Sequence, residues 1–302
     1  MTEVLINQIR ELLPSLELKQ EEPMRNHTTF RVGGPAELYA CPSLEQLPLL
    51  MKLAQEASVP VTVIGNGSNL LVGDRGIRGL VVELGRSADV IRVDGNQLTI
   101  GAGTLLSKAA NAALAAGLGG MEFAAGIPGS VGGAVAMNAG AYGGEMKDIL
   151  LSAEVLTPEG EVRTLSLKEL DLSYRHSCIF EKNYVVLKAV IGLTPRPARE
   201  IEAQMNQLRE QRIAKQPLEY PSAGSTFKRP TGYFAGKLIQ DAGLRGYTVG
   251  GAQVSEKHCG FVINRGNATA ADILQLIRDV QERVQQQFGV SMETEVRLLG
   301  DF

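Results

Sequence analysis

Apolar residues recur at the spacing of a helix in several stretches of the chain. In residues 4–13, Leu5, Ile9, Leu12 and Leu13 fall on one helical face, which predicts a short amphipathic helix. Capping boxes, in which a hydroxyl residue is followed three positions later by Gln, Glu or Asp, predict where further helices begin. The other predicted helices are one from Ser43 and Gln46 to about 57, one at about 105–116 between a Thr104 cap and Gly117, a short turn capped by Ser166 and Glu169, one from about 199, one at 234–241, and a long amphipathic one after Thr269 and Asp272.

Strands are predicted where β-branched and aliphatic residues run together or alternate with polar ones. Asp94-Gly95 and the Pro-Glu-Gly at 158–160 are turn signals, so each predicts a hairpin between its flanking strands. The predicted strands are 36–40, 59–64, 80–84, 91–93, 97–100, 154–157, 161–165, 184–193, 260–264 and about 294–299.

The order of these elements suggests a chain of three parts. Residues 1–90 read as a small α/β unit, and the pattern changes to hairpins from Ile91 onward. Pro195 and Pro197 mark a second break, after which helices dominate. We therefore expect an α+β protein with parts at 1–90, 91–196 and 197–302.

A glycine-rich loop follows the strand that ends at Ile64. It reads Gly-Asn-Gly-Ser-Asn over 65–69, and an apolar run starting at Leu70 predicts a strand after it. Glycine allows close backbone approach and positive φ, and successive amides with uncharged side-chain donors suit a pyrophosphate. The third glycine of a Rossmann fingerprint is missing, which argues against that site. An ordinary turn between strands is the alternative.

A second glycine-rich stretch covers 126–144. It reads Gly-Ile-Pro-Gly-Ser-Val-Gly-Gly-Ala and then Met-Asn-Ala-Gly-Ala-Tyr-Gly-Gly from 137. So many small residues allow a flat or extended ligand to approach the backbone. A flexible linker is the alternative, but the apolar residues Ile127, Val131, Val135 and Met137 favour packed structure.

Composition narrows the function classes. The formal net charge of −3 and the lack of a basic run give no electrostatic case for nucleic acid. Three scattered cysteines are too few for a disulfide framework or a zinc site. The N-terminal residues do not resemble a signal peptide, and no stretch reaches the length of a membrane span. We expect a cytoplasmic protein without a membrane partner.

Six motifs together resemble the UDP-N-acetylenolpyruvoylglucosamine reductase (UDP-N-acetylmuramate dehydrogenase) family. They occur in the family's order and span almost the whole chain. They are Asn-His-Thr-Thr-Phe-Arg-Val-Gly-Gly-Pro-Ala at 26–36, Gly-Asn-Gly-Ser-Asn-Leu-Leu at 65–71, the stretch at 126–143, Tyr-Arg-His-Ser at 174–177, Tyr-Pro-Ser-Ala-Gly-Ser-Thr-Phe-Lys-Arg-Pro at 220–230 and Glu-Val-Arg at 295–297.

The resemblance implies a two-part FAD-binding domain of the vanillyl-alcohol-oxidase type (1–90 and 91–196) and a C-terminal α/β substrate-binding domain whose last strand returns toward the flavin site. It implies non-covalent FAD, NADPH as electron donor and UDP-N-acetylglucosamine enolpyruvate as substrate, reduced to UDP-N-acetylmuramate for peptidoglycan. The interval from Arg175 to Ser225 resembles the shorter subclass, which lacks a loop carrying a substrate-contacting tyrosine.

Site residues follow from the same resemblance. The implied FAD contacts are Ile64, Gly65, Asn66, Gly67, Ser68, Asn69, Leu70, Gly126, Ile127, Pro128, Gly129, Ser130, Gly132, Gly133, Ala134, Asn138, Val186, Arg212 and Arg297. The implied substrate contacts are Tyr174, Lys228 and Arg229.

Three residues match the family's catalytic positions. Hydride addition at C3 of the enolpyruvyl ether leaves negative charge at C2 and the carboxylate, which a preorganised guanidinium such as Arg175 would stabilise. Ser225 matches the acid that protonates C2, where geometry matters more than the weak acidity of a hydroxyl. Glu295, two positions before Arg297 on the predicted last strand, would lie on the same face beside the reaction centre.

Each of these residues also has an ordinary interpretation: a solvated arginine, a turn serine and a surface Glu-x-Arg pair. Two further patterns are rejected, because His258-Cys259 has no additional ligands for a metal and 232–237 lacks the spacing of a P-loop. Alternative functions are a flavoprotein oxidase on the same scaffold and a non-catalytic nucleotide-sugar-binding protein.

Overall fold

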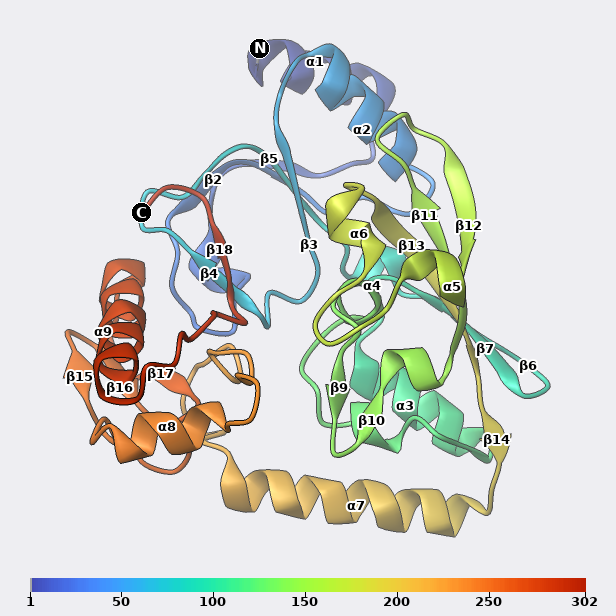
Figure 1. Ribbon diagram of the computed structural model, residues 1–302. Coiled ribbons are helices and arrows are strands. Elements are labelled where there is room, and N and C mark those ends of the chain that lie inside the picture. The colour runs from blue at the N-terminus through green and yellow to red at the C-terminus, as the bar shows by residue number, and fades with distance from the viewer. Residues whose placement is uncertain (1) are drawn as a thin grey trace. The chain divides into compact units, whose positions relative to one another are not determined.

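The computed structural model describes residues 2–302, which form two compact units (Figure 1). Unit 1 contains the described residues up to Lys19, together with Leu38–Asn66 and Gly79–Arg212. Unit 2 contains Gln20–Glu37, Gly67–Arg78 and Ile213–Phe302. The first glycine-rich loop is therefore divided between the units after Asn66, and the expected three-part division at 90 and 196 stays a prediction.

Unit 1 holds most of the helices and strands. Its elements are α1 (Thr2–Leu12), α2 (Leu47–Glu56), β3 (Val61–Ile64), β6 (Ile91–Asp94), β7 (Gln97–Gly101), α3 (Leu106–Ala115), β8 (Leu118–Gly119), α4 (Val131–Ala136), β9 (Gly140–Ala141), β10 (Gly144–Glu145), β11 (Leu150–Leu156), β12 (Val162–Ser166), α5 (Leu167–Leu170), α6 (Cys178–Glu181), β13 (Val185–Gly192) and β14 (Thr194–Pro195). Four elements have residues in both units: β1 (Leu18–Pro23), β2 (Pro35–Ala40), β5 (Ile77–Glu83) and α7 (Ala198–Lys215).

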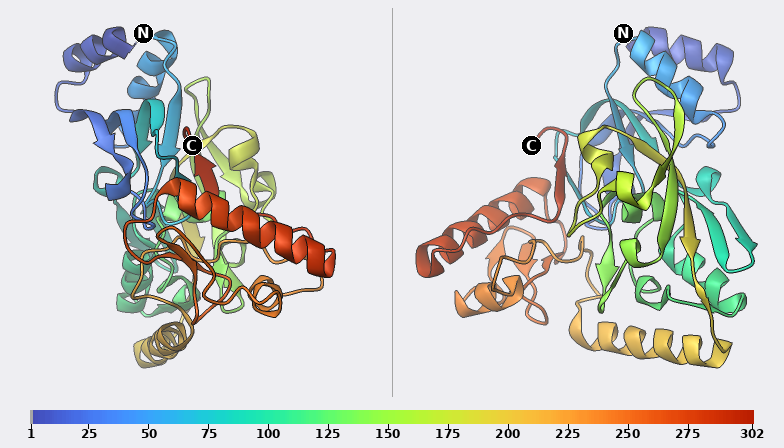
Figure 2. Two further views of the ribbon diagram at one scale, coloured as in Figure 1. Left: turned by 90° about the vertical axis from the view of Figure 1, so that its left-hand side faces the viewer. Right: turned by 45° about the vertical axis from the view of Figure 1, so that its right-hand side comes forward.

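An antiparallel sheet with the strand order β12-β11-β13-β7-β6 is the largest element of unit 1. Its strands alternate apolar and polar residues, so one set of side chains enters the core, including Leu98, Ile100, Ala153, Val155 and Ala189. Helix α4 packs on β13 and β7 of this sheet. Helices α1 and α2 pack against each other, as both views of Figure 2 show.

Unit 2 is built around the longest helix. Its elements are β4 (Leu70–Val72), α8 (Ala235–Asp241), β15 (Thr248–Val249), β16 (Ala252–Val254), β17 (Val262–Asn264), α9 (Ala270–Phe288) and β18 (Arg297–Leu299). The apolar face of α9 is buried where it packs on β15 and β16 and on α8. Strand β18 pairs in parallel with β4, which follows the first glycine-rich loop.

Both ends of α9 are stabilised by local contacts. The Thr269 hydroxyl accepts from the Asp272 amide at 3.0 Å, and the Asp272 carboxylate accepts from the Thr269 amide at 3.0 Å. Asp74, from a distant segment of the chain, accepts from the Ala270 and Ala271 amides at 2.8 and 2.9 Å. Gly289, with φ of 68°, ends the helix in the left-handed conformation. The helix start therefore joins two of the three chain segments of unit 2.

Most of the predicted helices and strands are confirmed, as are both hairpins and the capping boxes at Ser166 and Thr269. The packed structure expected in the second glycine-rich stretch is also confirmed, since it contains α4. Three details were wrong. Ser43 and Gln46 bond each other reciprocally, but α2 begins only at Leu47 and has no side-chain cap. Thr104 does not cap α3, because its buried hydroxyl donates to Asp89 Oδ1 at 2.9 Å. The last strand begins only at Arg297, so Glu295 lies just before it.

Across residues 2–302, none of the helices is long and apolar enough to cross a membrane.

Candidate active site and cofactor site

The first half of the 65–69 loop lies against the second glycine-rich stretch within unit 1. Asn66 Nδ2 donates to the backbone oxygen of Pro128. A Cβ on Gly65 would come within 2.2 Å of the Ser130 hydroxyl oxygen, so the two stretches are in close contact here. The two stretches that the sequence singled out separately are therefore neighbours, as one ligand bound by both would require.

The second half of the loop is supported by unit 2. Gly67 has φ of 61°, and a Cβ on it would collide with the carbonyl oxygen of His27. The Gly67 carbonyl accepts from the Thr29 amide at 3.3 Å. Within the described chain, the buried Thr29 Oγ1 has no hydrogen-bond partner. A buried hydroxyl without a partner is costly, so this atom beside the loop fits a polar group of a bound ligand.

Asn69 connects this loop to the end of the chain. Its Nδ2 donates to the Glu295 carbonyl at 2.9 Å, and its own carbonyl accepts from the Arg297 amide at 2.9 Å. These two bonds fix Glu295 and Arg297 beside the loop through their backbones. The Arg297 side chain itself is exposed.

The second stretch offers exposed backbone and one cation. Gly126 and Gly133 are exposed, and Arg212 lies against Gly126, because a Cβ on this glycine would come within 3.2 Å of Arg212 Nη1. Burial lowers the pKa of the half-buried Arg212, although the nearby Tyr142 opposes this shift. An arginine remains charged under all physiological conditions. Arg212 therefore places a fixed positive charge at this stretch, which suits a phosphate or a flavin.

Several predicted FAD contacts have little exposed surface. Ile64, Ser130, Gly132, Ala134 and Val186 are buried. Any contact they make with a cofactor is limited to a small area or to a backbone atom, and their roles stay predictions.

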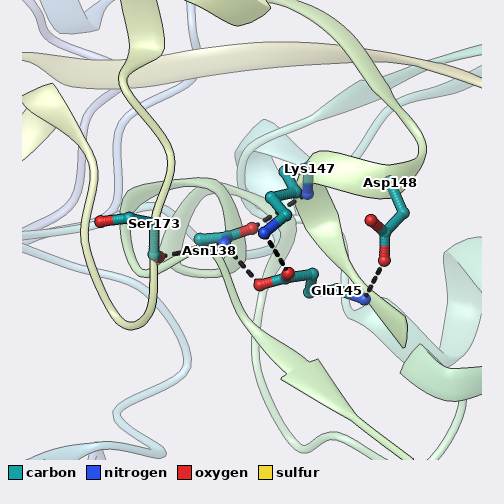
Figure 3. A network of polar contacts seen from close by, with 5 residues as sticks. All are labelled: Asn138, Glu145, Lys147, Asp148 and Ser173. Carbon is teal, nitrogen blue, oxygen red and sulfur yellow. Dashed lines mark hydrogen bonds and ion pairs between the residues drawn. The ribbon is translucent and has the colours of Figure 1, made fainter. Parts of the chain in front are cut away.

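Asn138 is a correction to the predicted FAD contacts. Its side chain is fully buried, at 0% exposure. Its Nδ2 donates to Glu145 Oε2 at 2.7 Å and to the Ser173 carbonyl at 3.0 Å, and its Oδ1 accepts from the Lys147 amide at 2.9 Å (Figure 3). Because the side chain has no exposed surface and both its amide protons are used by protein groups, it is not available to a cofactor.

Arg175 lies at the tip of a tight turn in unit 1. The amides and carbonyls of Ser173 and His176 bond each other reciprocally at 3.1 and 3.2 Å, leaving Tyr174 and Arg175 between them. Arg175 has φ of 56°, which is unfavourable for a residue with a side chain. Its Nη2 donates to the Gly140 carbonyl at 3.4 Å, and its guanidinium lies 5.1 Å from the centre of the Tyr174 ring. The turn presents a cation and an exposed aromatic ring together.

Ser225 and Glu295 lie on neighbouring extended segments of unit 2. Thr226 joins them, because its carbonyl accepts from the Glu295 amide at 2.8 Å. On its other side Ser225 forms a bridge with Phe261, and the buried Thr226 hydroxyl accepts from the Val262 amide at 3.0 Å. The Ser225 side chain is exposed and preceded by Gly224 with φ of 76°. The structure thus brings these two predicted catalytic residues together, while Arg175 belongs to unit 1.

The two cations after Ser225 have protein partners of their own. Lys228 Nζ lies 3.0 Å from Glu293 Oε2. Arg229 Nε donates to the Tyr233 carbonyl at 3.3 Å, and its guanidinium lies 4.0 Å from the Phe234 ring centre. Both Tyr233 and Phe234 are exposed and were not singled out from sequence. Thr29 was also missed, although it lies in the first of the six motifs.

His258 and Cys259 have structural surroundings. The His258 Nδ1 accepts from the Gly260 amide at 3.1 Å, its ring meets Phe261 edge to face, and burial lowers its pKa. Burial also raises the pKa of the Cys259 thiol, which keeps it protonated. Both residues support the segment that pairs with Ser225.

Comparison with families of known proteins gives two matches. Residues 35–166 match the family described as FAD binding domain. Residues 216–299 match the family described as UDP-N-acetylenolpyruvoylglucosamine reductase, C-terminal domain. The first match includes both glycine-rich stretches, and the second includes Ser225 and Glu295.

The chain is also similar, over its full length, to individual proteins that share one name. The chain is 58% identical to a UDP-N-acetylenolpyruvoylglucosamine reductase of Agathobacter rectalis, with 100% of both chains covered. It is 49% identical, again over 100% of both, to the protein of that name from Caldanaerobacter subterraneus. Among solved structures, that of UDP-N-acetylenolpyruvylglucosamine reductase from Thermus caldophilus matches with a TM-score of 0.81 and 37% identity, covering 94% of this chain and 99% of the other.

Proposed function

Because the chain belongs to the UDP-N-acetylenolpyruvoylglucosamine reductase family, we propose that it reduces UDP-N-acetylglucosamine enolpyruvate to UDP-N-acetylmuramate. NADPH is the electron donor of this reaction. The chain is an FAD-dependent oxidoreductase that serves peptidoglycan synthesis. The observation that carries the proposal is its likeness, over the full length, to relatives of this name. An NADPH-dependent step on a nucleotide sugar also supports our proposal that the protein is cytoplasmic.

FAD is the cofactor of this chain, and the site residues fit it. The 65–69 loop and the stretch from Gly126 offer backbone amides without bulky side chains, Arg212 supplies a fixed cation, and Thr29 Oγ1 is a buried donor beside Gly67 that needs a partner. When bound, FAD supplies a carrier that takes a hydride equivalent from NADPH and delivers it to C3 of the substrate.

Arg175 holds the substrate carboxylate in this proposal. A planar guanidinium can donate two parallel hydrogen bonds to a carboxylate. As hydride reaches C3, charge moves from C2 into that carboxylate, and a fixed cation stabilises the more charged species most. The turn, with its positive φ at Arg175, and the bond to the Gly140 carbonyl would hold the guanidinium in place for this role.

Ser225 delivers the proton in this proposal. Its exposed hydroxyl donates to C2, forming the new C–H bond, and regains a proton from solvent. We propose that Glu295, whose amide donates to the Thr226 carbonyl, orients Ser225 or the substrate. Proton transfer by a positioned group typically contributes about 10²–10⁴-fold to a rate.

The nucleotide end of the substrate has candidate partners close in sequence to Ser225. Lys228 and Arg229 would bind the diphosphate, since arginine and lysine are the usual phosphate ligands. Arg229 already lies over the exposed Phe234 ring, which holds its guanidinium in place. Tyr174, exposed beside Arg175, is a candidate contact for the sugar.

The two half-reactions, measured separately, test this proposal. The purified protein should show a flavin spectrum, lose it on anaerobic addition of NADPH and recover it when the enolpyruvyl nucleotide is added. Failure of that nucleotide to reoxidise the flavin would reject the proposed substrate. Fast reoxidation by oxygen after bleaching by an alcohol would point to an oxidase, and a colourless protein that ignores NADPH would point to a binding protein.

A further inference from the structure

A polar cluster in unit 1 connects three segments around Asn138, which is its one buried member. The cluster consists of Asn138, Glu145, Lys147, Asp148 and Ser173 (Figure 3). Besides its bonds to Asn138, Glu145 forms an ion pair with Lys147 at 2.6 Å, and its amide donates to Asp148 Oδ2 at 2.9 Å. Figure 3 shows Asn138 between the Ser173 loop and the segment of Glu145 and Lys147.

The side chain of Asn138 is used by the protein and has no exposed surface. An asparagine side chain has two amide protons to donate and one oxygen with two lone pairs. Glu145 and the Ser173 carbonyl accept both protons, and the oxygen accepts from the Lys147 amide. The residue itself has φ of 42°, so it occupies an unfavourable backbone region as well. Such a position is stable only when its surroundings hold it.

The cluster is connected to Arg175 through two separate sets of contacts. Ser173, whose carbonyl Asn138 binds, is the first residue of the turn that presents Arg175. Glu145, the other partner of Asn138, pairs in β10 with Gly140 of β9, and the Gly140 carbonyl accepts from Arg175 Nη2. One buried amide thus fixes the base of the turn and, through Glu145, the strand that receives the guanidinium.

We propose that Asn138, held by Glu145, is a positioning residue that aims the Arg175 guanidinium at the substrate carboxylate. The inference rests on the role given to Arg175 above. It predicts a specific defect: without Asn138 the turn relaxes and Arg175 moves, while flavin reduction by NADPH, in which the proposed function gives Arg175 no part, continues. Misplacement of a catalytic group by about 1 Å can cost about 10²-fold.

Asn138→Ala tests this in the full-length, FAD-loaded protein. We expect reoxidation of the reduced flavin by the enolpyruvyl nucleotide to slow by about 10–100-fold, and flavin reduction by NADPH to stay within about twofold. Lys147→Gln is the matched control, because it removes an ion pair of Glu145 but keeps the Lys147 amide that binds Asn138. That control should leave both half-reactions near the parent rates, as is usual for an exposed pair.

If Asn138→Ala does not fold, Glu145→Ala takes its place, since it removes one acceptor of Asn138 without emptying a buried site. Glu145→Gln, which keeps an acceptor oxygen, should restore most of the rate lost in Glu145→Ala. An equal slowing of both half-reactions in the folded variant would mean a merely structural role and overturn the proposal.

A double-mutant cycle separates this inference from the function it rests on. If Asn138 acts through Arg175, then Asn138→Ala should add almost no further slowing in an Arg175→Ala background. Fully additive effects would overturn the positioning role while leaving Arg175 in place. If Arg175→Ala alone leaves reoxidation unchanged, the assignment of Arg175 itself fails, and the inference fails with it.

Discussion

The two units hold their proposed catalytic residues by different means. In unit 1, backbone bonds between Ser173 and His176 close the Arg175 turn, and the buried Asn138 side chain donates to its base at the Ser173 carbonyl. In unit 2, Ser225 and Glu295 are connected by backbone bonds through Thr226, by a β-bridge from Ser225 to Phe261 and by one from Phe227 to Thr294. If Asn138 positions Arg175 as proposed, one side-chain substitution should displace Arg175, whereas the unit 2 pair should tolerate most single side-chain changes. Substitutions in each unit test this difference.

The largest effect is expected from Ser225→Ala, which removes the proposed acid without disturbing the backbone bonds around it. Reoxidation by the enolpyruvyl nucleotide should slow by about 10²–10⁴-fold, with flavin reduction by NADPH nearly intact. Stopped-flow absorbance of the flavin measures both steps. Equal losses in the two steps would contradict a role confined to the substrate.

Arg175→Lys keeps the positive charge but loses the planar pair of donors. We expect reoxidation to slow by about 10–100-fold, because an ammonium group cannot reproduce two parallel bonds to a carboxylate. The apparent KM should also rise, since the lysine variant binds the substrate carboxylate more weakly. Steady-state kinetics with varied substrate would show both changes, and unchanged values would refute a carboxylate contact.

Thr226→Val tests the backbone scaffold of unit 2. It leaves the Val262 amide without the hydroxyl that accepts from it at 3.0 Å in a fully buried site. The free energy of unfolding should fall by about 1–3 kcal/mol, as urea titration would measure. Thr226→Ser keeps the acceptor and should lose less; if the two variants lose equally, the hydroxyl contributes nothing.

Asp272→Asn should lower the free energy of unfolding by about 1 kcal/mol at neutral pH, through the cap of α9. The pKa of Asp272 is lowered chiefly by the bond from the Thr269 amide, from an ordinary value of 3.8. A lowered folded-state pKa stabilises the protein above 3.8, and this stabilisation is lost as pH falls through the folded-state pKa. The gap between parent and variant in urea titrations should therefore close in acid; a gap that persists there would contradict this charge effect.

A similarly small effect is expected from Thr29→Val. In contrast to the polar atoms of Asn138, Thr29 Oγ1 has no hydrogen-bond partner among residues 2–302. Loss of one hydrogen bond to FAD should weaken cofactor binding by roughly 0.5–1.5 kcal/mol, or about twofold to tenfold. Titration of the flavin-free protein with FAD, followed by flavin fluorescence, measures this. Stability of the flavin-free protein should be equal or higher in the variant, and tighter FAD binding would exclude the proposed contact.

Local signals in the sequence were enough for most elements. Capping boxes such as Thr269 with Asp272 and the turn at Asp94-Gly95 involve residues three or four positions apart, so their contacts can be inferred from spacing. The two glycine-rich stretches were also recognised, because their composition is unusual wherever they lie. Motif likeness then located Ser225, Glu295 and Arg175 along the chain.

Long-range contacts could not be inferred in this way. The bond from Asn69 to Glu295 joins residues 226 positions apart, and no local pattern encodes it. Polar residues were misread for the same reason. Thr104 and Asn138 have side chains suited to a cap and to a ligand, but tertiary neighbours (Asp89 for one, Glu145 and Ser173 for the other) use those groups first.

Unit 2 is built from three separate chain segments, so it cannot fold completely until the last of them has been synthesised. Phe30, Val32 and Leu71 share their core with side chains of α9, and Asp74 caps that helix. On a ribosome these early residues emerge long before their partners, so the part of the cofactor loop that includes Gly67 and Asn69 should stay protease-sensitive until the last strand, β18, has been made. We expect nascent chains halted before Ile213 to be cleaved in 20–37 and 67–78, and protection of both segments in such chains would disprove this order.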